Sequence, residues 1–405
     1  MATKSKPQRA LEAGHAGGGG AATAADCGAA APTLAPGPTD SEPQDLAACR
    51  ALLAHGSRTF LAASRLLPRG VRDSACALYA FCRLADDEVD GQTGGGAPNA
   101  PAGDVPADSA AAVARLRARL HRVYHGLPMA APADRALAAV VRRFNIPALL
   151  PEAMIEGFEW DSANRRYETL ADLQDYAARV AGTVGAMMAL LMGVRSAAGL
   201  ARACDLGVAM QLSNIARDVG EDARAGRLYL PRQWLREAGI EPDAWLAAPT
   251  HSPALGQVVR RLLREADALY ARVDAGVAAL PLGCRPGINA ARYLYAQIGL
   301  EVERRGLNAV DSRAVVSRRR KAVSLARALL LLAPSAAAGT PPPLDATRFL
   351  VEAVTGPLAL LPEMAAARQE VQRPPRPARA IDGLEGVIAL FERLERRDRG
   401  VLAID

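Results

Sequence analysis

Four aspartates in this 405-residue chain stand in two pairs, and the members of each pair are four positions apart. Asp86 and Asp90 lie in the run LYAFCRLADDEVDG, and Asp218 and Asp222 lie in the run QLSNIARDVGEDARAGRLYLP. Both runs have the apolar spacing of a helix, on which residues four apart lie on one face. Like charges at that spacing cost a helix about 0.2–0.5 kcal/mol. Paired carboxylates are also ligands that a hard cation such as Mg²⁺ accepts, so the spacing indicates metal chemistry.

The first pair lies at the border of a predicted buried helix face. On a helical wheel, Asp86 and Asp90 share a stripe with Tyr79 and Arg83. This stripe is about 100° from the apolar side of the helix. The apolar side consists of Ala75, Leu78, Cys82, Ala85 and Val89.

The second pair repeats this arrangement. Gln211, Asn214, Asp218 and Asp222 follow one another in steps of three, four and four, which keeps them on one side of a helix. That side is about 90° from an apolar face. The face consists of Val208, Leu212, Ile215 and Val219. Two facing helices with such stripes would hold a Mg²⁺–diphosphate group between them, and the ion would make the diphosphate a better leaving group.

A carboxylate at the border of a core costs free energy unless a positive group meets it. Arg83, one turn from Asp86 and Asp87, is one candidate partner, and a divalent ion is the other. Asp87 and Glu88 point further outward, and we expect both to be solvated. Solvated surface charge is the alternative explanation for each aspartate pair. The pattern alone does not decide between surface charge and a metal site.

The composition favours a helical protein with an aliphatic core. Half of the residues are hydrophobic and only 4% are aromatic. Alanine and leucine are abundant, and both are good helix formers. Alternating runs of the kind that form strands are few. The longest apolar runs, VGAMMALLMGV and ALLLLA, are far shorter than the roughly 20 residues that cross a bilayer, so we expect no membrane-spanning helix.

The net charge and the cysteine pattern indicate which kinds of partner and which cellular compartment to expect. The net charge is +6, with one dense basic run at 317–322. Such a surface favours phosphates or an anionic membrane as partners. Nucleic acid is disfavoured, because no binding motif accompanies the basic run. None of the six cysteines forms a CxxC pair, which indicates reduced thiols in the cytosol, and no secretory signal is visible.

The chain divides into one predicted domain with loose ends. Residues 1–43 form a low-complexity run that predicts a disordered tail. Residues 44–330 predict an all-α domain, interrupted by a flexible Gly- and Pro-rich insert at 91–109. Residues 331–405 predict a helical extension packed on the same domain. The clearest helical patterns fall at 109–126, 170–194, 203–226, 254–280 and 289–306.

Five segments resemble the squalene/phytoene synthase family, and its bacterial phytoene synthase branch most. The resemblance covers about residues 45–325, and the segment with the second acid pair is its most specific part. The segments are GSRTFLAASRLLP (56–68), ALYAFCRLADDEVDG (77–91), RYETLADLQDYAARVAGTVGAMM (166–188), QLSNIARDVGEDARAGRLYLP (211–231) and YAQIGLEVERRGLNAVDSRAVVSRRRKA (295–322).

The resemblance implies a fold and a reaction. The fold is all-α, a single isoprenoid-synthase-type helical bundle around a central cavity. The reaction is the head-to-head condensation of two prenyl diphosphates, which are both geranylgeranyl diphosphate in the phytoene synthase branch. One diphosphate leaves, the allylic cation is captured by the other molecule's double bond, and prephytoene diphosphate forms. A second ionisation and rearrangement gives phytoene, in carotenoid biosynthesis. Mg²⁺ is the implied cofactor, with Mn²⁺ as an alternative ion, and no NADPH is expected.

The resemblance also implies metal ligands and catalytic residues. Asp86, Asp90, Asp218 and Asp222 match the catalytic acids that bind the metal, and Asp87 matches a further acidic position. The tyrosines in catalytic positions are Tyr79 and Tyr295.

Other positions match contacts to the substrate. They are the diphosphate contacts Arg58, Arg83, Arg217, Gln211 and Asn214, the cavity tyrosines Tyr176 and Tyr229, and the channel residues Val180, Gly182, Val184 and Gly185. By periodicity alone VAGTVGAMM is a buried helix packed through small residues, and Tyr229 is a loop anchor. Family members often have two adjacent arginines near 310–314, where this chain has VDSRAVV, and Arg313 is the candidate for that contact.

Two alternatives to the phytoene synthase prediction stay open. One is a synthase that uses farnesyl diphosphate and makes presqualene diphosphate, dehydrosqualene or squalene. The other is a non-catalytic helical lipid-binding or scaffold protein. We expect a cytoplasmic protein with no nucleic acid partner and no defined protein partner. Because the expected product is very apolar, peripheral attachment to the inner face of the membrane is a further expectation.

Overall fold

The computed structural model describes residues 43–56, 63–89, 108–330 and 341–356, which all lie in a compact unit that begins at Pro38. Every regular element in this described part is a helix. The predicted all-α fold class is therefore confirmed. No helix among these residues combines the length and hydropathy needed to cross a bilayer.

The predicted N-terminal tail, the predicted insert and the predicted C-terminal extension lie mostly outside the described residues. Of the predicted tail and insert, only the starts of two helices are described, at Pro43 and Asp108. Of the predicted extension, residues 341–356 are described, and they include the helix α15 (Arg348–Thr355). This helix contacts helices of the main bundle, α6, α8 and α9.

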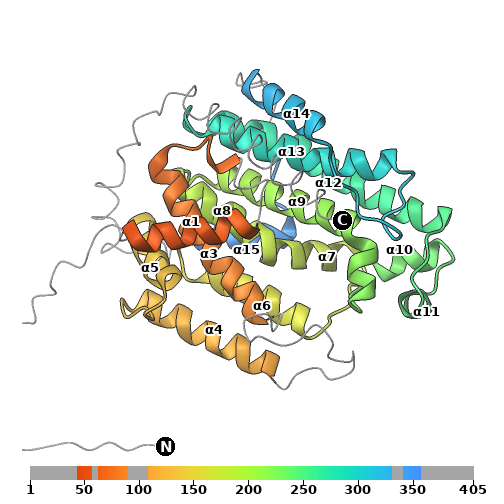
Figure 1. Ribbon diagram of the computed structural model, residues 1–405, viewed down its shortest axis with the longest axis horizontal. Helices are drawn as coiled ribbons and strands as arrows, with labels where there is room; N and C mark the ends of the chain where they lie inside the picture. Colours follow the sequence, from red (N-terminus) through yellow and green to blue (C-terminus); the bar gives the residue numbers. More distant parts are fainter. Residues whose placement is uncertain (1–42, 57–62, 90–107, 331–340, 357–405) are drawn as a thin grey trace, which may run out of the picture. The chain divides into compact units, whose positions relative to one another are not determined.

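In the N-terminal part of the bundle, the helices that lie within the described residues pack against one another (Figure 1). They are α1 (Pro43–Gly56), α3 (Arg69–Val89), α4 (Asp108–Tyr124), α5 (Pro132–Phe144) and α6 (Leu149–Ser162). Helix α3 packs against α1 and α5, and α4 packs against α5 and α6. Ala75, Leu78 and Ala85 of the predicted apolar face of α3 are buried. This face fixes the rotation of α3 about its axis, and therefore the side on which Tyr79 lies.

The predicted helix at 170–194 contains three segments. They are α7 (Leu170–Ala177), the π-helix η1 (Ala178–Gly182) and α8 (Thr183–Leu191). A capping box begins the first of them: Asp172 N–H donates to Thr169 Oγ1, and Thr169 N–H donates to the Asp172 carboxylate. A π-helix inserts an extra residue per turn and is often found at functional sites. Apolar periodicity does not reveal such an insertion.

Helix α9 (Ala197–Arg224) contacts more of the other helices than any other element in the described part of the chain. Its neighbours include α7, α8, η1, α12, α13 and α15. Ser196 caps its start, because its hydroxyl accepts a hydrogen bond from Gly199 N–H. The predicted apolar face is buried, with Val208, Leu212 and Ile215 each at most 3% exposed. Helix α9 therefore positions the second acid pair.

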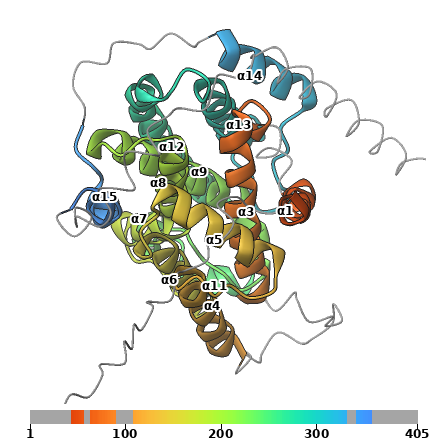
Figure 2. The same cartoon turned by 90° about the vertical axis from the view of Figure 1, so that its left-hand side faces the viewer.

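The remaining helices follow α9 in the sequence. They are α10 (Arg232–Glu237), α11 (Pro242–Ala247), α12 (Pro253–Ala279), α13 (Arg285–Arg304), α14 (Arg318–Leu330) and the 3₁₀ turn η2 (Asp345–Thr347). Helices α12 and α13 both pack on α9, and α14 packs on α13 (Figures 1 and 2).

Two glycines let α9 approach the η1–α8 segment closely. A Cβ atom on Gly207 would lie 2.2 Å from the carbonyl oxygen of Ala181, and one on Gly185 would lie 2.1 Å from that of Ala203. Both distances are far below van der Waals contact, so only glycine allows this approach. The small residues of the VAGTVG run therefore have a packing role, as periodicity alone predicts.

Candidate active site

A cavity of about 360 Å³ lies between α3, η1, α8, α9, α12 and α13. Its walls are mostly apolar, with Val184, Met188, Met192, Leu206 and Leu280 among the lining residues. Large clefts of this kind, with few polar groups, are the usual form of a small-molecule site.

Helix α9 lines the whole length of this cavity with one stripe of residues. The stripe consists of Gly199, Arg202, Leu206, Met210 and Asn214, which follow one another at three- and four-residue steps. Because an α-helix rises about 1.5 Å per residue, positions 199 to 214 span about 22 Å. Gln211 and Asn214 lie at one end of the stripe, next to the second acid pair. The cavity therefore has a polar end and an apolar end.

The predicted stripe of α3 reaches the same cavity. Tyr79, which shares a stripe with the first acid pair, lines the cavity together with Leu78 and Cys82. Tyr295 of α13 lines it as well. The structure thus brings together residues of three helices, although 132 positions separate Tyr79 from Gln211 and 81 positions separate Asn214 from Tyr295.

The first acid pair is only partly described. Arg58, Asp90 and the Asp86 side chain lie outside the described residues. Asp87 pairs with Arg83, whose Nη2 atom lies 2.6 Å from Asp87 Oδ1. This is the arginine–carboxylate pairing that the sequence offered as one alternative.

The expectation that Glu88 is solvated is wrong. Its side chain is only 14% exposed and accepts hydrogen bonds from Arg115 Nε at 3.0 Å and Arg119 Nη1 at 2.7 Å. Arg119 also binds the buried carboxylate of Asp134. Glu88 therefore links the end of α3 to α4 and, through Arg119, to α5. A helical wheel of α3 cannot show these contacts, because the partners lie on other helices.

In the second acid pair, Asp218 is held by arginines. Arg217 Nε lies 2.7 Å from Asp218 Oδ1, and Arg313 Nε lies 2.8 Å from the same oxygen. Arg313 also lies 3.5 Å from Glu221. Arg313 was a candidate on the family resemblance, and the fold brings it to the acid pair from 95 positions away.

Asp222 has a different environment. Burial, and then the negative charge of Asp218, raise the pKa of its carboxyl group from 3.8 to about 7. Asp161 raises this pKa further, whereas Arg227 lowers it. Among the described residues no hydrogen bond or ion pair reaches the Asp222 side chain. A carboxylate in this position calls for a cation.

Asp161 is a site residue that the sequence reasoning did not identify. Its carboxylate accepts hydrogen bonds from Tyr176 Oη at 2.8 Å and from Tyr229 Oη at 2.7 Å. The rings of these tyrosines and of Tyr167 stack on one another, with centroids 5.2–6.1 Å apart. Burial raises the pKa values of Tyr176 and Tyr229, which therefore stay protonated. The available signal was an aspartate directly after an apolar aromatic run, GFEW.

The residues that the family resemblance predicts in the prenyl channel divide into two groups. Val180, Val184 and Gly185 line the cavity. Tyr176, Tyr229 and Gly182 are not among the described residues that line it. Gly182 instead lies against Leu350 of α15, since a Cβ atom there would be 3.4 Å from Leu350 Cδ1. The VAGTVG segment thus packs against α15 on one side and forms part of the cavity wall on the other.

The donor set at the polar end suits a hard divalent ion. In the described part of the chain, no three Asp, Glu, His or Cys side chains gather closely enough to hold a metal by themselves. Asp218 and Asp222 nevertheless supply oxygen ligands, and Arg227, which lowers the pKa of Asp222, forms no ion pair or hydrogen bond with the Asp222 side chain among the described residues. Mg²⁺ typically takes one or two carboxylates and completes its shell with water and substrate phosphates. The residues therefore fit such an ion together with a diphosphate.

Comparisons with known proteins place this site in a family. The model of the squalene/phytoene synthase family matches residues 53–320. The chain is 49% identical to the phytoene synthase of Rhodobacter capsulatus over 362 residues, which cover 89% of this chain and 98% of the relative. It is 48% identical to the phytoene synthase of Cereibacter sphaeroides, over 88% of this chain and 95% of the relative.

Solved structures agree in fold. A dehydrosqualene synthase in complex with ligand is similar with a TM-score of 0.63 and 29% identity, over 71% of this chain and 96% of that one. A squalene synthase from Alicyclobacillus acidocaldarius is similar with a TM-score of 0.57 and 26% identity, over 65% and 95% of the two chains. The chain therefore belongs to the squalene/phytoene synthase family, with the isoprenoid-synthase helical fold and the prenyltransferase class that the sequence predicted.

Proposed function

We propose that the protein is a phytoene synthase that condenses two geranylgeranyl diphosphates head to head. One observation carries the proposal: Tyr79 on the stripe of the first acid pair, and Gln211 and Asn214 on that of the second, line one apolar cavity. Such a cavity suits a long hydrocarbon chain with a diphosphate at its polar end. The substrate is the one implied by the names of the relatives from Rhodobacter capsulatus and Cereibacter sphaeroides.

The polar end binds and orients the diphosphates. Arg217 and Arg313 lie at Asp218, and their guanidinium groups can turn from it to phosphate oxygens, which arginine binds strongly. The side-chain amides of Gln211 and Asn214 offer further donors on the cavity surface. Together these groups would fix the C1–O bond of each substrate at the same end of the cavity.

The reaction then proceeds by two ionisations. The C1–O bond of one substrate breaks, and the diphosphate leaves with the electron pair. The C2=C3 double bond of the second molecule attacks the allylic cation, and loss of a proton closes the cyclopropane ring of prephytoene diphosphate. The second C1–O bond breaks in the same way, the ring rearranges, and loss of a proton gives phytoene. No electrons are added, so no NADPH is needed.

The cavity wall protects these cations. Met188, Met192 and Leu206 exclude water, which would otherwise capture the cation and give an alcohol. The rings of Tyr79 and Tyr295 lie on the wall, and aromatic faces attract cations. This arrangement favours capture of the cation by the second substrate.

Mg²⁺ is the proposed cofactor. Asp218 and Asp222, together with Asp86, Asp90 and Asp87, would hold it. When bound, the ion neutralises charge on the departing diphosphate. Asp222 would then stay ionised near neutral pH, because a cation opposes the effects of burial and of Asp218 on its pKa.

The test is turnover by the purified protein. Geranylgeranyl diphosphate and Mg²⁺, without NADPH, should give a C40 hydrocarbon, and omission of the metal should abolish it. Asp218→Ala should lower kcat/KM at least about a hundredfold, because a metal ligand contributes several kcal/mol. A folded, metal-loaded wild type that forms neither phytoene nor prephytoene diphosphate would exclude the proposal.

Farnesyl diphosphate is the second candidate substrate. The dehydrosqualene and squalene synthases of similar structure favour it. The same assay with farnesyl diphosphate, with and without NADPH, separates the two. A non-catalytic lipid-binding or scaffold protein is excluded if Asp218→Ala abolishes a turnover that the wild type has.

Peripheral membrane attachment accompanies the proposal, because the product is apolar. Leu282, Leu300, Val315 and Val323 are large apolar residues that are exposed on or near α13 and α14, and α14 begins with three arginines. Apolar side chains among basic ones are typical of surfaces that bind anionic lipids. Sedimentation with anionic liposomes at low salt tests this, and protein that stays in the supernatant would exclude it.

A further inference from the structure

The largest fully buried side chain among the described residues is charged. Arg202 of α9 is 1% exposed, and it lines the cavity at the end opposite Asn214. These two residues are 12 positions apart on one helix, or about 18 Å. A buried guanidinium at the wall of an apolar cavity is costly unless all its donors are used.

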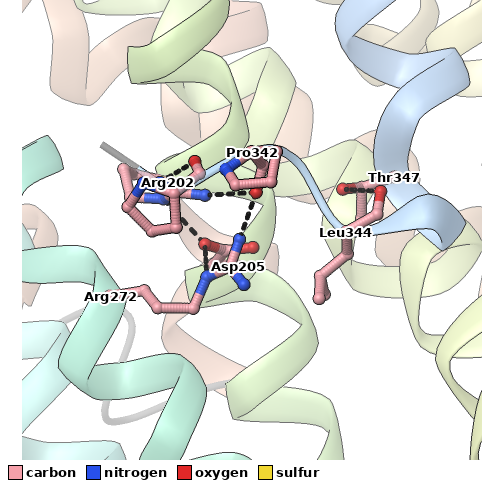
Figure 3. Close-up of polar contacts among 7 residues, drawn as sticks. Arg202, Asp205, Arg272, Pro342, Leu344 and Thr347 are labelled. Atoms are coloured by element: carbon pink, nitrogen blue, oxygen red, sulfur yellow. Dashed lines mark hydrogen bonds and ion pairs between the residues drawn. The ribbon is translucent and has the colours of Figure 1, made fainter. Parts of the chain in front are cut away.

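The guanidinium of Arg202 is bound by Asp205 and by two backbone carbonyls (Figure 3). Nε donates to Asp205 Oδ2 at 2.7 Å, Nη1 donates to the Pro341 carbonyl at 2.7 Å, and Nη2 donates to the Pro342 carbonyl at 3.3 Å. Each nitrogen of the guanidinium thus has a partner in the protein, which leaves the aliphatic stem of Arg202 as the part of the side chain that can meet an apolar ligand.

A second arginine completes this cluster from α12. Arg272 Nε donates to Asp205 Oδ2 at 2.8 Å, and its Nη2 donates to the Pro342 carbonyl. Asp205 is fully buried and serves both arginines. We call Arg202, Asp205, Arg272 and the two proline carbonyls the latch. It joins α9, α12 and the segment at 341–344, which follows the part of the chain that the family model matches.

The stem of Arg202 is confined on its other side by α12. A Cβ atom on Gly276 would lie 2.4 Å from Arg202 Cβ and 3.0 Å from its Cγ. Gly276 lines the cavity too. The absence of a side chain at this position is therefore what allows the stem to lie where it does.

The chain beyond the latch supports the neighbouring wall. Thr347 and Leu350 are fully buried, and they lie behind Gly182 of η1, at 3.6 and 3.4 Å from the position of a Cβ atom on it. Ala181 and Val180 of the same π-helix line the cavity. Residues 341–350 thus contact both the closed end and one wall from outside.

We propose that the Arg202 stem, held by the latch, is the floor of the prenyl cavity and determines the longest prenyl chain that the protein accepts. This rests on the proposed function for the class of substrate, a prenyl diphosphate. A diphosphate bound at Asn214 directs its chain along α9 towards Arg202. The last isoprene unit of the longest accepted chain then meets the stem, and a longer chain collides with it.

Because Arg202 and Gly276 are in contact, replacing each of them should shift the chain-length preference in opposite directions. Arg202→Ala removes the floor, and it should raise kcat/KM for the diphosphate one isoprene unit longer than the preferred one, relative to the preferred one, by about tenfold. Gly276→Ala should place a methyl group on the cavity wall beside the stem, and so shift the preference by a similar factor towards the shorter chain. Arg202→Met, which keeps the stem but loses the latch, should shift it less than Arg202→Ala.

The preference is measured with an equimolar mixture of C15, C20 and C25 prenyl diphosphates, by the consumption of each. A ratio from such a competition does not depend on how much of a variant is folded. Arg261→Ala is the control, because Arg261 also lies on α12 and pairs with Glu237 at the surface.

The outcomes separate this proposal from the proposed function. If the wild type consumes prenyl diphosphates but Arg202→Ala and Gly276→Ala leave its chain-length preference unchanged or shift it in the same direction, Arg202 is not the floor. If the wild type consumes none, the proposed function fails instead. In that case the rise in melting temperature caused by each of the three diphosphates measures the chain-length preference of binding. If Arg202→Ala and Gly276→Ala do not shift this preference in opposite directions, Arg202 is not the floor.

Discussion

Arg313 Nε lies 2.8 Å from Asp218 Oδ1, although the two residues are 95 positions apart. Arg313 is in the loop between α13 and α14, and Asp218 is in α9. Gly220 makes this contact possible: its N–H donates to the Ala309 carbonyl, and a Cβ atom on it would lie 2.2 Å from the Val310 carbonyl oxygen. The loop is thereby fastened to α9 beside the acid pair.

Replacement of Arg313 should weaken the binding of diphosphate. In Arg313→Gln we expect KM to rise and kcat/KM to fall about tenfold or more, because a hydrogen bond to a charged group contributes about 1.5–3 kcal/mol. Steady-state kinetics with geranylgeranyl diphosphate checks this, and Arg261→Gln on α12 is the control. Unchanged kinetics would mean that Arg313 serves only as an ion-pair partner of Asp218.

The raised pKa of Asp222 predicts how stability depends on pH in the absence of metal. Its pKa is about 7 in the folded protein against an ordinary value of 3.8, so the folded state binds the proton more tightly than the unfolded state. Stability should therefore fall as the pH rises from about 4 to 7, by up to roughly 4 kcal/mol. Above pH 7 this contribution is lost.

Urea unfolding at pH 5 and 7.5, with and without Mg²⁺, measures this effect. Asp222→Asn should remove the contribution of this carboxyl group to the difference in unfolding free energy between pH 5 and pH 7.5. Mg²⁺ should restore stability to the wild type at pH 7.5, because it binds the ionised carboxylate. A wild type whose metal-free stability does not differ from that of Asp222→Asn across this range would show that the carboxyl group is not perturbed.

The sequence predicted those features that depend on neighbours along one helix. The apolar faces of α3 and α9, the Arg83–Asp87 pair and the position of Tyr79 on the stripe of the first acid pair all follow from spacing of three and four. These contacts are local, so the wheel contains them.

The features that the sequence did not predict depend on where distant helices meet. Glu88 is paired because Arg115 and Arg119 of α4 reach it, and Asp161 is hydrogen-bonded because Tyr176 and Tyr229 converge on it. For Arg202 only the pair with Asp205, three positions away, is local, because its two other acceptors are backbone carbonyls some 140 positions away. Spacing within a helix carries no information about such partners.

Asp161 should stabilise the fold and also modulate Asp222. Asp161→Ala leaves the buried hydroxyls of Tyr176 and Tyr229 without their acceptor, so we expect it to lower the free energy of unfolding by about 2–5 kcal/mol. Asp161→Asn can still bond the hydroxyls and should recover most of this. Because Asp161 raises the pKa of Asp222, the Asn variant should also lower that pKa.

Urea denaturation and the pH dependence of stability measure the two effects of Asp161 separately. Asp243→Ala is the control, since Asp243 is 68% exposed and its pair with Arg232 should contribute less than about 1 kcal/mol. Equal stability of Asp161→Ala and the wild type would contradict the assignment of both hydrogen bonds.

The glycine contacts between α9 and η1–α8 give the last prediction. In Gly207→Ala the new methyl group would lie 2.2 Å from the Ala181 carbonyl oxygen. Backbone atoms cannot turn aside as a side chain does, so the two helices must separate. Such overpacking typically costs 1–3 kcal/mol, and because Gly207 and Ala181 both line the cavity, we expect prenyl diphosphate turnover to fall as well.

Gly256→Ala is the matched control for this change. Gly256 is also a buried helical glycine, in α12, but a Cβ atom there would have its nearest neighbour at 3.4 Å, which is ordinary contact. Alanine should therefore fit and stabilise the helix by about 0.5–1 kcal/mol. Urea denaturation of both variants gives the two free energies. Opposite signs are expected, and a Gly207→Ala protein as stable and active as Gly256→Ala would mean that α9 and η1 can separate without cost.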